Sequence, residues 1–173
     1  MQIIKRIQSG FDFPEDVLLF LRIFMLASVL PLLVKFLSIP KLMNIITPRT
    51  PVPGVKCDDI TRKKIEKYTD YILGANCWIY NSTCLKRSLI MYSFLRKYGM
   101  NVRVCFGVKY KKEMSVGLEG NQLDGHAWLL YNGDIYLEKN IQVTKTYIMT
   151  YCYPEISDDV RGKGFIPAIE GFK

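Results

Sequence analysis

The sequence contains a single histidine, His126, and this scarcity restricts the chemistry open to the protein. Protein zinc sites combine several Cys and His ligands, so a zinc site is nearly excluded and any imidazole chemistry must use this residue. The five cysteines lie at positions 57, 77, 84, 105 and 152 and form no CxxC pair. Their odd number fits reduced thiols of a cytoplasmic protein better than a disulfide framework.

The chain also has little uncharged hydrophobic sequence in one piece. Its most apolar stretch, residues 17–37, is interrupted by Arg22 and Lys35. A membrane-spanning helix needs about 20 apolar residues, so this stretch is expected to be too short to span, and its flanks do not resemble a signal peptide. We expect two helices buried against the body of the protein and broken near Pro31 and Pro40. A helix lying on a membrane surface is the alternative.

The overall composition is that of one ordinary domain. The chain has 173 residues, of which 49% are hydrophobic and 23% charged, which is enough for a packed core. The formal net charge of +8 favours an acidic partner: a nucleic acid, a membrane surface or an acidic peptide. A proline-rich connector at residues 47–56 suggests an apolar helical extension over residues 1–50 and an α+β domain over residues 51–173.

Two helices are predicted after the connector. Asp58 or Asp59 can cap the first helix, and Gly74 ends it. The second helix begins at a cap supplied by one of residues 81–83, carries apolar residues at helical spacing, and ends at Gly99.

The rest of the domain is predicted to be a small antiparallel sheet. Alternating apolar and polar residues over 102–108 indicate a strand, and a polar loop is expected over residues 110–125. Residues 126–140 form a hairpin signal around an Asn-Gly pair, and the segment 141–153 can add a further strand.

Cys84 lies in the first turn of the second predicted helix. Unpaired backbone N–H groups and the helix dipole favour an anion such as a thiolate at that position, and Lys86, Arg87 and a protonated His126 are cations that can assist. The structural alternative is a small buried side chain at a helix start, because free cysteines are usually buried and inert.

The register of the hairpin decides which residue faces His126. A three-residue loop, residues 131–133, separates an apolar face from a face that carries His126, Trp128, Asp134, Tyr136 and Glu138, whereas a two-residue loop mixes them. The three-residue register places Glu138 opposite His126, where its carboxylate can accept the imidazole N–H. Such a pair can serve a cysteine nucleophile, although a structural hydrogen bond or a solvated strand-end charge is the simpler interpretation of each residue alone.

The run CLKRSLIMYSFLRKYGMNVRVCFGVKY, followed by GHAWLLYNGDIYLEKN, resembles the transglutaminase-like, papain-related cysteine peptidases. Within them it is similar to the B2 leader peptidases of lasso peptide biosynthesis. The resemblance covers about residues 60–140, and it implies a core of helices packed on a small antiparallel sheet. It implies that Cys84 is the nucleophile and His126 the general base. The third member of the family triad is usually Asp; Glu138 stands at the matching place, and Asp134 is the alternative.

By this resemblance the protein is expected to be a cysteine endopeptidase that removes the leader from a ribosomally made lasso-type precursor peptide, without a metal or cofactor. The expected partners are the precursor, a separate winged-helix leader-recognition protein of the B1 type, and an ATP-dependent macrolactam synthetase, with no nucleic acid. The backbone N–H of Cys84 is one expected oxyanion donor, and Trp78 or Asn81 is a candidate for the second. The alternatives are a transglutaminase-like acyl transferase, a basic RNA- or single-stranded-DNA-binding module, and a membrane-associated scaffold.

Overall fold

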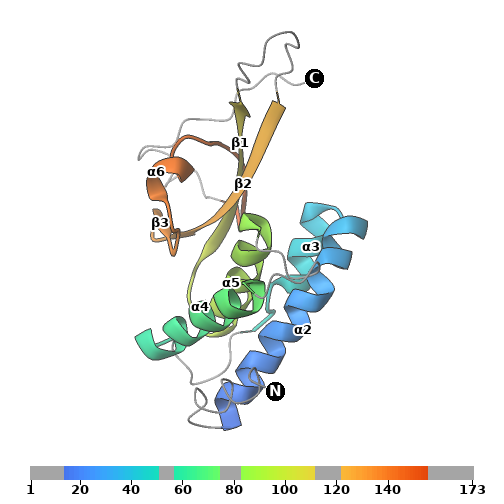
Figure 1. The fold of residues 1–173 in the computed structure, drawn as a ribbon, viewed down its shortest axis with the longest axis vertical. Helices are drawn as coiled ribbons and strands as arrows, with labels where there is room; N and C mark the ends of the chain where they lie inside the picture. Colours follow the sequence, from blue (N-terminus) through green and yellow to red (C-terminus); the bar gives the residue numbers. More distant parts are fainter. Residues whose placement is uncertain (1–13, 51–56, 75–82, 112–121, 156–173) are drawn as a thin grey trace. The chain divides into compact units, whose positions relative to one another are not determined.

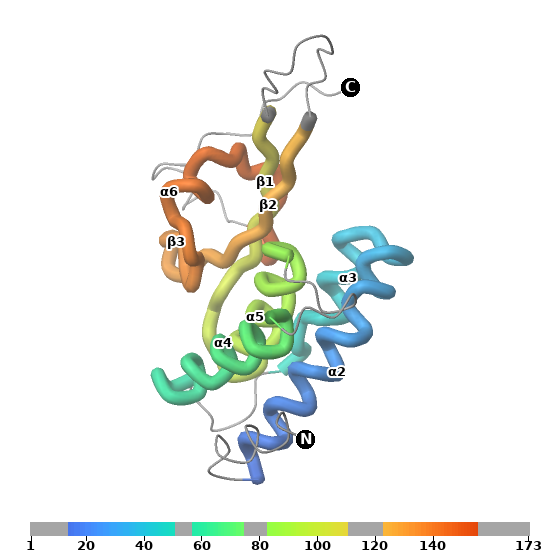
Figure 2. Tube along the Cα trace, viewed as in Figure 1, coloured from blue at the N-terminus to red at the C-terminus, as the bar shows by residue number. Residues whose placement is uncertain are grey.

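The computed structural model describes residues 14–50, 57–74, 83–111 and 122–155. The chain divides into two compact units, residues 1–99 and residues 100–173, which are described one at a time. Figures 1 and 2 follow the chain from the helical first unit to the sheet of the second.

The described residues of the first unit form four helices: α2 (Pro14–Phe36), α3 (Ile39–Ile46), α4 (Asp59–Leu73) and α5 (Cys84–Lys97). The two helices predicted after the connector are confirmed as α4 and α5. The Asp58 carboxylate caps α4 by accepting the backbone N–H of Thr61 at 2.7 Å. Thr83 caps α5, and Gly99 follows its end with a φ of 83°. The capping residues and the glycine recognised in the sequence therefore determine where both helices begin and end.

The predicted helix pair near the N-terminus exists as α2 and α3. The break predicted near Pro40 is confirmed, whereas the break predicted near Pro31 is wrong. Pro31 lies inside α2, and the chain instead leaves the helix after Phe36. Pro40 lies in the first turn of α3, where a missing N–H costs no helical hydrogen bond. The predicted burial holds for one side of α2 only, because a second set of its apolar side chains is exposed.

The second unit is an antiparallel sheet with the strand order β3-β2-β1-β4. Its strands are β1 (Arg103–Lys111), β2 (Gln122–Tyr131), β3 (Asp134–Tyr136) and β4 (Ile148–Tyr153), and the short helix α6 (Ile141–Thr144) precedes β4 (Figure 1). β1 and β2 extend into the segment expected to be a loop, so residues 110, 111 and 122–125 are strand. The remainder of that expected loop lies outside the described residues.

The predicted hairpin register is wrong by one residue. Tyr131 pairs with Asp134, so the loop contains only Asn132 and Gly133, whose φ values are 52° and 91°. Two successive positive φ angles belong to the hairpin turn whose twist matches that of paired strands. Because β3 is only three residues long, its mixed pattern of apolar and polar side chains costs little buried surface.

The observed register changes which side chains share a face of the sheet. Trp128, expected on a polar face, is 4% exposed and forms an apolar cluster with Leu130, Cys105 and Cys152. Ile135 packs against the same cluster, although it was expected on the opposite face. Five helices and a four-stranded antiparallel sheet confirm the predicted α+β class within the part of the chain that the structure describes.

Candidate active site

His126 lies in β2 beside two oxygen atoms that face the same ring nitrogen. Its Nε2 is 3.5 Å from Oε2 of Glu138 and 3.2 Å from Oγ1 of Thr144. The side chains of His126 and Glu138 are only 14% and 16% exposed. A carboxylate only accepts hydrogen bonds, so Nε2 is the nitrogen that it favours as the N–H donor. Among the described residues, Nδ1 makes no hydrogen bond and is left as the acceptor.

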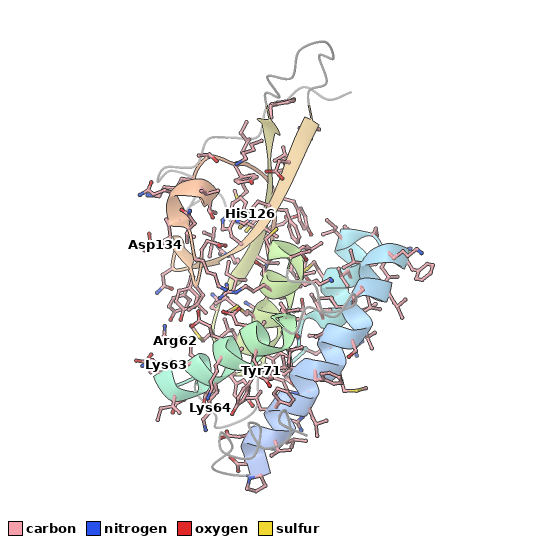
Figure 3. The ribbon with its side chains drawn as sticks, viewed as in Figure 1. Arg62, Lys63, Lys64, Tyr71, His126 and Asp134 are labelled. Atoms are coloured by element: carbon pink, nitrogen blue, oxygen red, sulfur yellow. The ribbon has the colours of Figure 1, made fainter. Side chains whose placement is uncertain are left out.

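Glu138 contacts His126 as expected, but it is not paired with His126 across the hairpin strands. The β2–β3 ladder ends at Tyr136, and Leu137 then adopts a φ of 53°, which takes the chain out of the strand. Asp134, the alternative third member, is exposed beside the turn, and Figure 3 shows it away from His126. Glu138 is therefore the acid that the structure brings to the imidazole.

Two aromatic rings fix the plane of the imidazole. Trp128 stacks on His126 with ring centroids 5.9 Å apart, and Tyr147 lies 4.9 Å away at an angle of 32°. Gly107, which pairs with His126 across β1 and β2, leaves room for the indole: a Cβ there would lie 2.8 Å from the Trp128 ring. A glycine is required at this position because of that close approach.

Tyr147 is itself held by charged residues of β1 and β2. Its hydroxyl donates to Oδ2 of Asp124 at 2.8 Å, and Nζ of Lys109 lies 4.3 Å from the centre of its ring. Burial, followed by the hydrogen bond to Asp124, raises the pKa of Tyr147, so the phenol keeps the proton that it donates. His126 is thus oriented through its edge by Glu138 and Thr144 and through its faces by aromatic rings.

Cys84 belongs to the other unit, where it is the first residue of α5. It is a half-buried free thiol, and the Thr83 hydroxyl caps its helix by accepting the N–H of Lys86 at 3.3 Å. The backbone N–H groups of a first helical turn have no partner within the helix, so the N–H of Cys84 is available to an anion. The predicted position of Cys84 at a helix start is confirmed.

The other described cysteines are poorly suited to attack an electrophile. A hydrogen bond with Cys152 and burial hold the pKa of the Cys105 thiol far above its usual range, and both residues lie in the apolar cluster of the sheet. Burial and the neighbouring Asp58 raise the pKa of Cys57. The hydrogen bond with Cys105 lowers the pKa of Cys152, but this residue is buried in the sheet and out of reach of a substrate. Burial of Cys105 and Cys152, and the raised pKa of Cys57, leave Cys84 as the best placed of the four. Cys77 lies outside the described residues.

Arg87, one of the cations expected near Cys84, is paired with carboxylates of α4. Its guanidinium donates to Asp70 at 2.7 Å and to Glu66 at 3.3 Å, and these carboxylates belong to α4. Its charge is therefore used to join α5 to α4, because a planar guanidinium binds carboxylates in this way. The candidate oxyanion donors Trp78 and Asn81 lie outside the described residues.

Thr144 and Tyr147 are the site residues that sequence reasoning missed. The only local signal was Asn140, which caps α6 by accepting the N–H of Val143 at 3.2 Å and so fixes the helical turn that carries Thr144. No sequence spacing relates that turn to His126, since the two meet only when the chain folds back after β3.

A family model described as the transglutaminase-like superfamily matches residues 26–149. No curated protein and no solved structure matches the chain. The superfamily comprises mainly cysteine-dependent enzymes, including cysteine peptidases and acyl transferases. The match extends over more than two thirds of the sequence and includes both Cys84 and His126. The chain belongs to the transglutaminase-like superfamily.

Proposed function

We propose that the protein is a cysteine endopeptidase that removes the leader peptide from a lasso-type precursor, with Cys84, His126 and Glu138 as its catalytic residues. The observation that carries the proposal is the imidazole of His126, whose Nε2 faces the Glu138 carboxylate while Nδ1 makes no hydrogen bond to the described residues. An oriented base of this kind is what a cysteine nucleophile requires. The superfamily match supports a cysteine-dependent enzyme. The choice of substrate class rests on the sequence resemblance to the B2 leader peptidases.

The proposed reaction has two steps. The sulfur of Cys84 attacks the scissile carbonyl carbon after its proton passes to Nδ1 of His126, and that proton then goes to the leaving amine as the C–N bond breaks. Water next attacks the thioester, giving its proton to His126. The C–S bond breaks, the leader leaves as a carboxylic acid, and the thiol is restored. Glu138 stabilises the imidazolium in both steps.

The proposal includes three partners. The precursor peptide is the substrate, a separate winged-helix protein delivers its leader, and an ATP-dependent macrolactam synthetase closes the ring on the released core peptide. The net charge supports an acidic leader, because residues 1–99 hold 15 Lys and Arg against 7 Asp and Glu, whereas residues 100–173 hold nine of each. All of the net charge of +8 thus lies in the first unit.

The test combines the purified protein with a lasso-type precursor and its recognition protein, and analyses the products by mass spectrometry. Hydrolysis gives two fragments whose masses together exceed that of the precursor by one water. An acyl transferase, the second class present in the superfamily, instead joins the acyl fragment to an added amine. Its product is heavier than the acyl fragment that hydrolysis releases. The absence of any cleavage by the complete mixture would contradict the proposal.

We also propose that α2 binds a membrane surface. α2 is 23 residues long and by length and composition is apolar enough to cross a bilayer, contrary to the expectation from sequence. However, Ile23 on one side is fully buried, and Asp16 forms a 2.7 Å ion pair with Lys64 of α4. That side is held by protein, which supports a helix lying along a surface rather than one surrounded by lipid.

The other side of α2 has the pattern of an interfacial helix. Arg22 and Lys35 lie about 140° apart around the helix, at 100° per residue. Between them is a set of apolar side chains, each 42–75% exposed: Leu18, Leu21, Met25, Val29, Leu32 and Phe36. An apolar stripe flanked by cations suits a bilayer that contains anionic lipids.

We expect the protein to float with vesicles that contain phosphatidylglycerol and to bind much less to vesicles of phosphatidylcholine alone. Leu32→Glu should release it, because the charge would enter the apolar stripe. Ile60→Glu is the matched control, since Ile60 is 64% exposed but lies on α4. Failure of the wild-type protein to float, or equal loss in both variants, would contradict surface binding and favour a protein partner for this stripe.

A further inference from the structure

We propose that Thr144 is a positioning residue that acts with Glu138 to keep the proton of neutral His126 on Nε2, so that Nδ1 is the basic nitrogen. The hydrogen-bond arrangement stands independently of the reaction; its consequence for catalysis rests on the proposed function. Thr144 is the last residue of α6 and is 1% exposed, so its hydroxyl must find its partners within the protein.

The proton of the Thr144 hydroxyl has a partner other than histidine. Oγ1 donates to the backbone carbonyl of Asn140 at 3.2 Å, one turn earlier in the chain. A hydroxyl has one proton and two lone pairs, so the contact of Oγ1 with Nε2 at 3.2 Å must then be one in which threonine accepts. Nε2 is therefore the donor and carries hydrogen.

Glu138 imposes the same choice independently. If Nε2 were unprotonated, its lone pair would face the carboxylate oxygen 3.5 Å away, and both atoms would be acceptors. With hydrogen on Nε2, this nitrogen can donate to Thr144 and is attracted to the carboxylate, so both contacts are favourable. Two oxygens on one ring nitrogen thus select one tautomer, and the hydrogen bond made by one nitrogen decides the state of the other.

The other described residues that contact the ring do not compete for this nitrogen. Tyr147 contacts the ring face, and its hydroxyl is bonded to Asp124, which lies 4.0 Å from Lys109. Trp128 contacts the ring by stacking alone. These residues set the plane of the imidazole, whereas Glu138 and Thr144 set the position of its proton.

The single histidine makes the tautomer directly measurable. In uniformly ¹⁵N-labelled protein, a long-range ¹H–¹⁵N correlation spectrum shows one pair of imidazole nitrogens, and at a pH where the ring is neutral we expect the Nε2–H form to dominate. Thr144→Val keeps the shape but removes the acceptor, and should raise the share of the Nδ1–H form about fivefold to tenfold, the effect of one hydrogen bond. Thr144→Ser should restore the wild-type ratio.

Thr146→Val is the matched control. Thr146 is exposed, two residues further along, and its hydroxyl donates to the carbonyl of Val143 without touching His126. An unchanged ratio in Thr144→Val, or an equal change in the control, would overturn the proposal. A dominant Nδ1–H form in the wild-type protein would overturn it without any variant, and Thr144→Ala replaces the valine variant should the latter not fold.

The catalytic consequence is measured separately. In Thr144→Val we expect kcat for leader cleavage to fall about tenfold with KM unchanged, and Thr144→Ser to recover it. A tautomer that shifts as expected in a protein without peptidase activity would reject the proposed function and leave the positioning role in place. Leader cleavage together with a tautomer ratio that Thr144→Val leaves unchanged would reject the positioning role and leave the proposed function in place.

Discussion

Cys84→Ala is expected to abolish leader cleavage, with a fall in kcat of about 10⁴-fold or more. Cleavage of an amide through a thioester requires a sulfur that forms a bond to the carbonyl carbon, and alanine offers none. Cys84→Ser should be almost as inactive, because a hydroxyl is a much poorer nucleophile than a thiol at neutral pH. Initial rates measured by mass spectrometry with the precursor and its recognition protein test both variants.

Cys57→Ala is the matched control for this loss. Cys57 is also a half-buried free thiol of the first unit, but burial raises its pKa, and it precedes α4 rather than α5. We expect this variant to cleave at the wild-type rate. Cleavage that survives in Cys84→Ala, or is lost in Cys57→Ala while the variant remains folded, would contradict the choice of nucleophile.

The second large effect is expected at Glu138. Glu138→Gln keeps an oxygen acceptor near Nε2 but removes the negative charge that, in the proposed reaction, stabilises the imidazolium in both steps. We expect kcat to fall about 100-fold or more, because charged partners of a catalytic histidine contribute effects of that size or larger. Glu138→Asp should recover part of the activity, since it restores the charge on a shorter side chain.

Asp134→Asn is the matched control for this variant, and it also decides between the two acids that the sequence offered. Asp134 is exposed beside the hairpin turn, so its charge is expected to matter little. A loss in Asp134→Asn that exceeds the loss in Glu138→Gln would show that the carboxylate seen beside His126 is not the one that serves it. Circular dichroism spectra of both variants verify that each remains folded.

The helices α4 and α5 could be predicted because their determinants are local. Asp58 and Thr83 each accept a backbone N–H in the first turn that follows, and a cap acts within three residues of its own position. Gly99 adopts the left-handed conformation expected at a helix end. The position of Cys84 at the start of α5 follows from these signals alone.

The hairpin shows where local reasoning fails. A three-residue loop would separate apolar from polar side chains, but β3 is too short for that separation to govern the register. The preference of the Asn132–Gly133 pair for a two-residue hairpin turn determines the register instead. Glu138 still contacts His126, because Leu137 adopts a positive φ and the chain leaves the strand there. No sequence pattern predicts this conformation at a leucine.

The partners of charged and polar side chains were the least predictable part of the site. Arg87 follows Cys84 by three residues in the chain, yet its guanidinium is bonded to two carboxylates of α4. Thr144 is 18 residues from His126 and contacts it across the fold. Both outcomes depend on tertiary packing, which brings together residues whose spacing in the chain has no fixed relation to their distance.

The dependence of Cys84 reactivity on His126 is the most direct test of whether the two residues work as a pair. The rate of alkylation by iodoacetamide at pH 6 can be followed for Cys84 and Cys57 in one digest by mass spectrometry, in the wild-type protein and in His126→Ala. We expect Cys84 to react at least about tenfold faster than Cys57 in the wild type, because the proposed pairing with the His126 imidazolium would favour the thiolate, and to lose this advantage in the variant. A rate at Cys84 that is the same with and without the imidazole would contradict the proposed catalytic pair.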